Sequence, residues 1–307
     1  MATPFTGIYP PVITSFNEEG ALYEQGIRNV IRYLMSEGVH GFFINGSYAS
    51  AALMTAGERK RVAEIIHEEV NGRLPIITHV GETSTRATIE LARHAAGLGS
   101  AAVAAVAPYY YAGANAYDEE QIIRHYAEIV QSVDVPTFMY NNPRTSGYNV
   151  TPELLAKLVK VGVRGMKDSS GSFTLLAEFN QAAAAVNPEF ACMSGSVGLL
   201  QPAFNIGLRG CIAGTANAFP ELAVALYRAL EARDWQKSGE LQNIVIAQRK
   251  IQATSGFRPA GCYTFLRMKG IDCGTVRRPW REPNEREARH MREAVVELGL
   301  LRRDDHG

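Results

Sequence analysis

The chain has 307 residues, with 31 Lys and Arg against 31 Asp and Glu and a formal net charge of +0 at pH 7. Its 46% hydrophobic and 20% charged residues are typical of soluble globular proteins and exclude a disordered chain. The balanced charge gives no electrostatic footprint for nucleic acid, so we expect no nucleic-acid partner. The N-terminus has neither a basic nor an apolar signal region, and the four cysteines form no C-x-x-C pair. We therefore predict a cytoplasmic protein with reduced thiols.

Short apolar runs alternate with longer amphipathic stretches along the chain, beginning with a run at residues 7–13 and a helical stretch at 21–37. Three later helices have start signals: a capping box at 55–58, acidic residues at 118–120, and Pro152 in a first helical turn. The remaining apolar runs, each predicted to be a buried strand, are 41–45, 75–80, 101–107, 136–140, 163–167, 190–194 and 210–214.

No charged residue occurs from Ala95 to Tyr117, a length that raises the alternative of a membrane span. The stretch consists largely of Ala and Gly and is interrupted by glycines and by Pro108. We therefore predict a helix end, a turn and a buried strand here, and no membrane partner.

Eight strand–helix units within about 230 residues predict an α/β fold, a (β/α)8 TIM barrel over residues 1–232. An open doubly wound sheet is the alternative, but no G-x-G-x-x-G follows an early strand. Residues 233–307 are predicted to form a C-terminal helical domain packed on the barrel, with helices at 234–254, 259–269 and 284–298.

Polar residues end three of the predicted strands, and in a barrel the active site lies at these carboxyl ends. Lys167 ends the sixth strand, Tyr140 ends the fifth, and Ser47 and Tyr48 follow the second. A buried lysine has a lowered pKa, and its neutral amine can form an imine with a keto carbon. A neighbouring tyrosine can move protons, and the turn after the second strand suits a carboxylate. The combination predicts a Schiff-base enzyme that acts on a 2-oxo acid.

Three motifs make the sequence resemble the pyruvate-dependent Schiff-base aldolase family, which includes dihydrodipicolinate synthase and N-acetylneuraminate lyase. They are Gly-Met-Lys-Asp-Ser-Ser-Gly at 165–171, Met-Tyr-Asn-Asn-Pro at 139–143 and Ala-Pro-Tyr-Tyr at 107–110. The resemblance runs from about residue 7 to residue 300. It implies an eight-stranded barrel with a C-terminal helical domain, a homotetramer built from two dimers, and a covalent imine on the lysine with no cofactor and no metal.

The resemblance also implies roles for single residues. Lys167 matches the Schiff-base lysine and Tyr140 the proton-shuttling tyrosine. Tyr110 matches a second tyrosine, which in the family reaches into the neighbouring subunit's site. Ser47 and Tyr48 occupy the positions that hold the carboxylate of pyruvate. Two further matches are Gly195, a glycine whose backbone lines the pocket, and Ser169, a polar residue two positions after the lysine.

Three departures from the family pattern bear on the substrate. The usual Gly-[Thr/Ser]-Thr-Gly-Glu reads Gly-Ser-Tyr-Ala-Ser at 46–50, so a phenol replaces the threonine of the synthase relay. Thr145 stands where synthases carry a carboxylate-binding arginine, and Arg144 lies one residue early. Residues 196–198 lack the acidic groups with which sialic-acid lyases bind sugar hydroxyls. We therefore expect a catabolic 2-keto-3-deoxy-acid-type aldolase, hydratase-aldolase or dehydratase, with a synthase for pyruvate and aspartate semialdehyde as the alternative.

Two hypotheses from other classes stay open. His79 and Glu82, near the end of the third strand, suggest a ligand pair for a metal-dependent aldolase, although a hydrogen-bonded histidine explains the first residue more simply. The altered turn at 46–50 suggests a sensor or scaffold that binds pyruvate without turning over any aldehyde.

Overall fold

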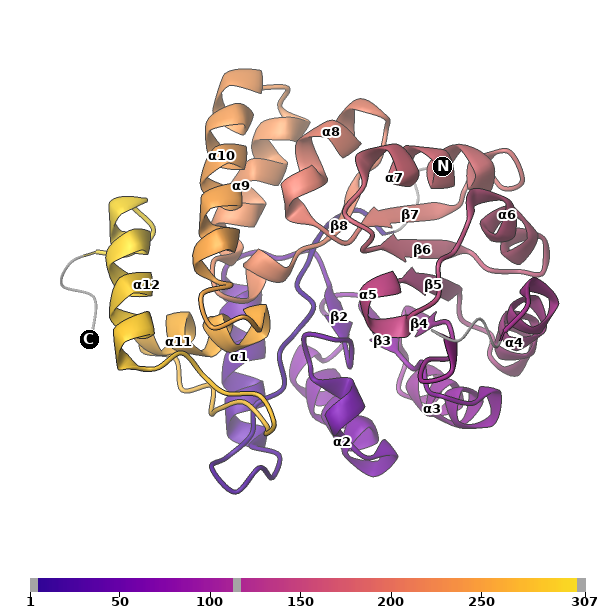
Figure 1. Cartoon of the computed structure of the whole chain (residues 1–307), viewed down its shortest axis with the longest axis horizontal. Coiled ribbons are helices and arrows are strands. Elements are labelled where there is room, and N and C mark those ends of the chain that lie inside the picture. Colours follow the sequence, from indigo (N-terminus) through magenta and orange to yellow (C-terminus); the bar gives the residue numbers. More distant parts are fainter. Residues whose placement is uncertain (1–4, 113–116, 303–307) are drawn as a thin grey trace. The chain divides into compact units, whose positions relative to one another are not determined.

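A computed structural model describes residues 5–112 and 117–302, in which strands and helices alternate (Figure 1). The described residues divide into two compact units, one of residues 5–7, 75–112 and 117–212 and the other of residues 8–74 and 213–302. The boundary at residue 232 between a barrel and a helical domain stays a prediction. The strands are β1 (Gly7–Tyr9), β2 (Phe42–Ile44), β3 (Ile76–His79), β4 (Ala102–Val106), β5 (Thr137–Asn141), β6 (Gly165–Asp168), β7 (Ala191–Ser194) and β8 (Gly210–Ile212).

The strands form a parallel sheet in the order β1-β8-β7-β6-β5-β4-β3-β2. At one end of this order, the N–H of Gly7 in β1 donates to the carbonyl of Arg209 at 2.8 Å. Just after β1, the N–H of Val12 donates to the carbonyl of Phe43 in β2 at 2.9 Å. The segment around β1 therefore bonds beside β8 on one side and to β2, the other end of the order, on the other side, which gives a (β/α)8 barrel. The predicted fold class is confirmed, and the open doubly wound sheet is wrong.

The strands of the first unit place alternate residues on opposite faces. Ala105, Met139 and Met166 are paired in register across β4, β5 and β6, and they belong to the core that packs against the helices. The next pair in register, Tyr140 and Lys167, therefore points to the barrel interior. Helices α3 (Thr85–Gly97), α4 (Glu119–Ser132), α6 (Pro152–Lys160) and α7 (Phe173–Ala184) lie around the outside (Figure 1). Two shorter helices are α5 (Pro143–Ser146), which directly follows β5, and α8 (Leu200–Asn205).

The predicted helix start signals are present as capping contacts. The Thr55 hydroxyl accepts from the N–H of Glu58 at 3.2 Å, and the Glu58 carboxylate accepts from the N–H of Thr55 at 2.8 Å. Asp118 caps α4, and Thr151 caps α6, whose first residue is Pro152. Each cap satisfies backbone N–H groups that have no partner inside the helix.

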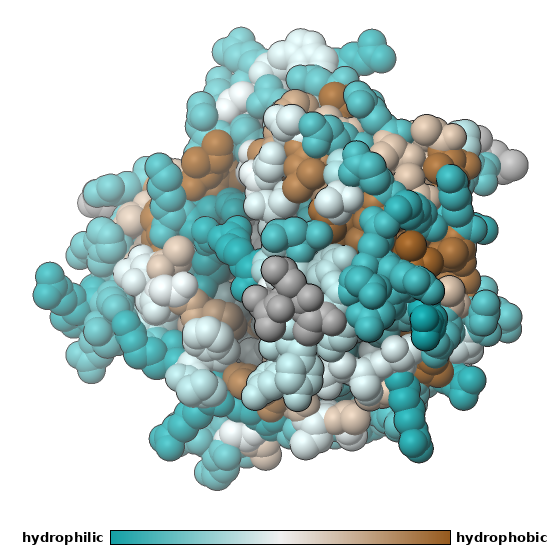
Figure 2. Space-filling view, turned by 45° about the vertical axis from the view of Figure 1, so that its right-hand side comes forward, coloured by the Kyte–Doolittle hydropathy of each residue, from teal (hydrophilic) through white to brown (hydrophobic). Residues whose placement is uncertain are grey.

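The long uncharged stretch forms the predicted helix end and buried strand in its described part. Helix α3 ends at Gly97, and residues 102–106 form the fully buried strand β4, while residues 113–116 lie outside the described residues. Among the helices of the described chain, none has the length and apolar character needed to cross a membrane. The face in Figure 2 is mostly hydrophilic, with separate hydrophobic patches.

The second unit contains the first two helices and the last four. The predicted C-terminal helices are present with shifts of a few residues at their ends. They contact earlier parts of this unit: the hydroxyl of Tyr263 donates to the carbonyl of Thr14 at 2.6 Å, and Lys269 pairs with Glu221 at 2.7 Å. The helices are α1 (Glu24–Ser36), α2 (Ala56–Val70), α9 (Pro220–Glu231), α10 (Trp235–Ile251), α11 (Arg258–Met268) and α12 (Glu285–Glu297).

Replacing Phe179 with Ala tests the core between strands and helices. Phe179 of α7 is 0% exposed, so the change should lower the free energy of unfolding by about 3–5 kcal/mol, through lost burial and a residual cavity. Val186, which follows the same helix and is 37% exposed, is the control, and its replacement by Ala should have a much smaller effect. Urea unfolding followed by circular dichroism measures both, and equal losses would contradict this core assignment.

Candidate active site

Strands β5 and β6 bring two of the predicted residues together. Tyr140 and Lys167 are direct partners in the register of the two strands. The Lys167 Nζ lies 4.0 Å from the centroid of the Tyr140 ring, and the residues are 4% and 3% exposed. Because both side chains point to the barrel interior, the amine and the phenol lie in a nearly dry environment.

The surroundings of Lys167 favour its neutral form. Burial lowers the pKa of Lys167 from its ordinary value, because a protein interior solvates an ammonium group poorly. The charge and hydrogen bond of Tyr140, and to a smaller extent Cys211, raise the pKa and so oppose this effect without cancelling it. A neutral amine at the end of a barrel strand is the nucleophile that imine formation requires.

Two further side chains contact Tyr140. The amide of Asn142 donates to the Tyr140 hydroxyl at 3.0 Å, and the ring of His79 lies edge-on at 5.6 Å between centroids. We did not single out Asn142 from the sequence, although it is the second Asn of the quoted Met-Tyr-Asn-Asn-Pro motif. Glu82 accepts from the hydroxyl of Tyr109 at 3.3 Å. Within residues 5–112 and 117–302, His, Cys, Asp and Glu side chains form no group of three or more that could hold a metal ion.

A buried polar cluster lies on the helix-facing side of the same two strands. Asn141 and Asp168 directly follow Tyr140 and Lys167, and the Asn141 amide donates to the Asp168 carboxylate at 2.7 Å. The Ser170 hydroxyl donates to the other oxygen of this carboxylate at 2.7 Å. Burial raises the pKa of Asp168 above its ordinary value, and the hydrogen bonds from Ser170 and Asn141 oppose this shift without cancelling it. The sequence motifs contained these residues, but their pairing depends on the strand register.

Gly195 and Ser169 meet beside Asp168. The N–H of Gly195 donates to the Asp168 carbonyl at 2.6 Å. A Cβ at position 195 would lie 2.3 Å from the Ser169 Oγ and 2.5 Å from the Asp168 carbonyl oxygen, so only glycine fits here. The predicted pocket residues Ser169 and Gly195 are therefore packed against the strand that carries Lys167, while their contact with substrate stays a prediction.

Tyr110 and Thr145 are exposed, in contrast to Tyr140. Tyr110 is 82% exposed and has a left-handed backbone with a φ of 81°, a conformation that costs a tyrosine about 1–3 kcal/mol. Its ring packs edge-on against Tyr111, with 5.0 Å between centroids. Thr145 in α5 donates its hydroxyl to the Asn142 carbonyl at 3.2 Å, and Arg144 beside it is also exposed. The roles of Tyr110 in a relay and of Thr145 in substrate binding stay predictions.

Ser47 and Tyr48 belong to the second unit, in a compact turn after β2. The N–H groups of Ala49 and Ser50 donate back to the carbonyls of Gly46 and Ser47, at 3.0 and 3.2 Å. The Tyr48 ring lies against Gly214: a Cβ at position 214 would lie 2.4 Å from the Tyr48 hydroxyl oxygen. The phenol that replaces the family's threonine is thus packed on the backbone that follows β8. Carboxylate binding by this turn stays a prediction.

Comparison with known proteins places these residues in a family context. The Dihydrodipicolinate synthetase family matches residues 4–298. A 4-hydroxy-tetrahydrodipicolinate synthase of Methanopyrus kandleri is 30% identical to this chain, and the match covers 98% of this chain and 99% of that synthase. A probable 2-dehydro-3-deoxy-D-pentonate aldolase of Escherichia coli is 31% identical, covering 80% of this chain and 79% of its own.

A solved structure has the same fold over nearly the whole chain. The protein YagE of Escherichia coli K12, a prophage protein of the dihydrodipicolinic acid synthase family, was crystallised in complex with pyruvate. It aligns with a TM-score of 0.92 and 27% identity, covering 97% of this chain and 99% of its own.

Replacing Tyr140 with Phe tests the phenol while keeping the ring. Deuterium exchange at C3 of pyruvate should slow by about 10²- to 10⁴-fold, the usual contribution of a positioned acid–base group. The pH at which borohydride traps half of Lys167 as a reduced imine with pyruvate should not rise. Tyr140 raises the pKa of Lys167, so the loss of its hydroxyl lowers that pKa further. Exchange is followed by NMR and trapping by mass spectrometry.

The control for this variant is Tyr126→Phe. Tyr126 of α4 is also buried, and its hydroxyl donates to the carbonyl of Ala105 at 2.7 Å, on the helix-facing side of β4. Its loss should leave both measurements near the native values. An equal slowing in the two variants, or a trapping midpoint that moves to higher pH in Tyr140→Phe, would contradict the assignment.

Proposed function

The chain belongs to the dihydrodipicolinate synthetase family of lyases, and from this membership we propose that it forms an imine between Lys167 and the pyruvate part of a 2-oxo acid. The enzyme then cleaves or makes the C–C bond between pyruvate and an aldehyde. The observation that carries the proposal is the buried Lys167 with a lowered pKa beside Tyr140. The pyruvate complex of the similar E. coli protein supports the choice of keto acid.

In the cleavage direction, the neutral Lys167 Nζ attacks C2 of the 2-oxo acid. The Tyr140 hydroxyl gives its proton to the C2 oxygen, which leaves as water, so that a protonated imine and a tyrosinate result. Tyr140 accepts the proton of the C4 hydroxyl as the C3–C4 bond breaks and its electron pair moves toward the imine nitrogen. The aldehyde leaves, and an enamine remains. Protonation at C3 and hydrolysis then release pyruvate and restore the lysine, and condensation is the reverse sequence.

In this proposal the turn at 46–50 binds the carboxylate of pyruvate. The Ser47 hydroxyl and backbone N–H groups of the turn are its donors, and the ring of Tyr48 is packed on Gly214. No separate cofactor takes part, because the imine itself withdraws the electrons. A cytoplasmic homotetramer, in which Tyr110 reaches a neighbouring subunit, belongs to the same proposal.

We favour a catabolic 2-keto-3-deoxy-acid-type aldolase, hydratase-aldolase or dehydratase. Thr145 replaces the arginine that synthases use, and Thr145 bonds back to its own strand end through the Asn142 carbonyl. The E. coli pentonate aldolase supports this choice, and the Methanopyrus synthase supports the alternative of condensation with aspartate semialdehyde.

Borohydride trapping tests the imine directly. The native protein, treated with pyruvate and borohydride, should gain the mass of one reduced pyruvyl group on the peptide that contains Lys167. Lys167→Ala should gain none, because the only proposed nucleophile is absent. Lys157→Ala is the control, since its side chain on α6 is 50% exposed, and it should trap like the native protein. An adduct that persists in Lys167→Ala would overturn the proposal.

Turnover with two kinds of substrate tests the class of reaction. Release of pyruvate or dehydration should be fastest with 3-deoxy-2-oxo sugar acids, and condensation of pyruvate with aspartate semialdehyde should be at least about ten-fold less efficient in kcat/KM. The reverse order would favour the synthase. Activity lost to a chelator but kept in Lys167→Ala would favour a metal-dependent aldolase, and an imine without any turnover would favour a sensor.

A further inference from the structure

Arg277, in the segment that leads to the last helix, makes an unusually complete set of contacts within the second unit. Its Nε and Nη2 groups donate to the Gly20 carbonyl at 2.9 and 2.5 Å. Nη1 donates to the Leu53 carbonyl at 2.9 Å, and Nη1 and Nη2 together hold the Glu58 carboxylate at 2.9 and 2.5 Å. A guanidinium has five N–H donors, and these contacts can occupy all five.

Leu53 and Glu58, the other two residues that accept from Arg277, lie at the C-terminal end of the proposed carboxylate-binding segment. Leu53 ends the 3₁₀ turn Ala51–Leu53, which begins three residues after Tyr48. Glu58 is the capping-box residue of α2, the helix that begins immediately after this segment. The segment 46–54 therefore has a fixed C-terminal end, and that end is held by Arg277.

The other end of this segment has separate anchors. The buried Asn45 donates its amide to the carbonyl of Arg59 in α2 at 2.8 Å. The Tyr48 ring packs on Gly214. Ser50, between these anchors and Arg277, has a left-handed backbone with a φ of 56°, which is unfavourable for serine and persists only where the surroundings hold it.

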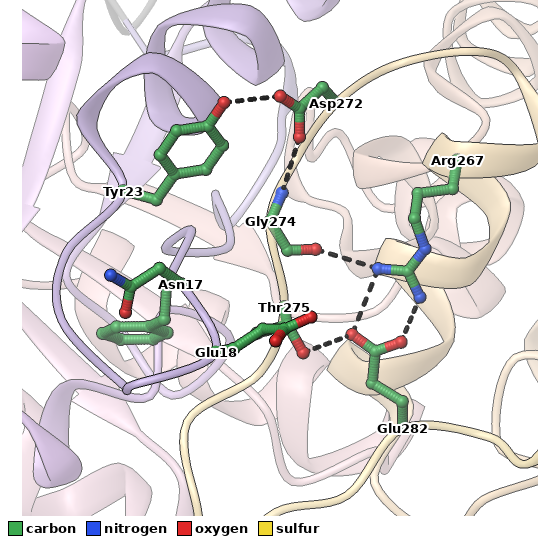
Figure 3. A pocket seen from close by; sticks show the side chains of 9 residues that line it. Asn17, Glu18, Tyr23, Arg267, Asp272, Gly274, Thr275 and Glu282 are labelled. Carbon is green, nitrogen blue, oxygen red and sulfur yellow. Dashed lines mark hydrogen bonds and ion pairs between the residues drawn. The ribbon is translucent and has the colours of Figure 1, made fainter.

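The segment that carries Arg277 is itself fixed to the loop before α1. Phe16 and Thr275 exchange backbone hydrogen bonds at 3.2 and 2.8 Å, and the Arg277 guanidinium stacks over the Phe16 ring at 4.3 Å. Figure 3 shows the adjoining pocket, in which Asp272 accepts from the Tyr23 hydroxyl and Thr275 donates to Glu282. These contacts hold the backbone that carries Arg277 in place.

We propose that Arg277 is a positioning residue that holds the turn of Ser47 and Tyr48 in the geometry that binds the substrate carboxylate. This inference rests on the proposed function. Arginine is required because a lysine has three donors on a single nitrogen, so it cannot reach the Gly20 and Leu53 carbonyls and bind Glu58 with two parallel bonds at once. The side chain of Arg277 is 15% exposed, so the ion pair is partly shielded from water.

The ion pair should persist at every pH at which the enzyme is assayed. The hydrogen bonds from Arg277 are the main cause that lowers the pKa of Glu58 to about 2. The carboxylate therefore stays charged above that pH. Its contribution to stability is fully present above its ordinary pKa of 4.5 and is lost progressively as the pH falls from there toward 2. Any pH dependence of trapping between pH 5 and 9 must come from elsewhere, mainly from Lys167.

The test is the pyruvate concentration that gives half-maximal borohydride trapping. In Arg277→Gln this concentration should rise roughly ten-fold, because the carboxylate donors are misplaced, while the pH profile at saturating pyruvate stays native. Arg277→Lys should not restore the native value. Glu58→Gln keeps a capping side chain but loses the charge, so we expect a smaller rise in the half-maximal pyruvate concentration. This variant replaces Arg277→Gln in the test if Arg277→Gln folds poorly.

Arg281 offers a matched control. It holds Glu287 with two bonds at 2.6 and 2.9 Å, and Glu287 is likewise the capping-box residue of its helix, α12. Arg281→Gln removes the same kind of contact without touching the segment 46–54. It should leave the half-maximal concentration within two-fold of native. Equal rises in Arg277→Gln and Arg281→Gln, or no rise in either, would overturn the inference.

Hydrogen–deuterium exchange separates this inference from the proposed function. Peptides that cover residues 46–54 should exchange faster in Arg277→Gln than in the native protein or in Arg281→Gln. If the native protein forms no pyruvate adduct, the proposed function fails, whatever the exchange shows. If the adduct forms but exchange and half-saturation are unchanged in Arg277→Gln, the positioning role of Arg277 fails alone.

Discussion

The proposed chemistry depends on the pairing of β5 with β6, because this pairing makes Tyr140 and Lys167 neighbours in a nearly water-free interior. Desolvation favours the neutral amine, and the tyrosine pulls the lysine pKa back toward its ordinary value. An imine cycle needs both tendencies, since the same nitrogen must attack as a free base and later carry positive charge. The strand register sets the balance between them.

The alternation of strand residues separates the two groups of the proposed imine chemistry from a second polar pair. Tyr140 and Lys167 point inward, while Asn141 and Asp168, one residue further along, bond to each other on the helix-facing side. This second pair joins the two strand ends one residue beyond Tyr140 and Lys167. Polar groups are costly to bury unless they are hydrogen-bonded, and the bond between Asn141 and Asp168 offsets that cost.

Apolar runs and strand-end residues predicted the barrel, its order of elements and the neighbouring positions of Tyr140 and Lys167. The strands and helices follow from local sequence pattern, and the neighbouring positions follow because parallel strands share a carboxyl edge. Other contacts lay beyond sequence reasoning. The bond between Asn141 and Asp168 requires the register, and Arg277 reaches Glu58 across 219 positions. The packing of Tyr48 on Gly214 likewise depends on backbone positions that no spacing in the sequence encodes.

The contact between Tyr48 and Gly214 couples two distant positions of this chain. A methyl group at 214 would overlap the phenol, with its carbon 2.4 Å from the hydroxyl oxygen and 2.5 Å from the ring carbon that bears it. With Tyr48 in this position, any residue other than glycine at 214 requires the phenol to move. A substitution at position 214 would therefore displace a side chain of the proposed carboxylate-binding turn, although residue 214 belongs to another part of the sequence.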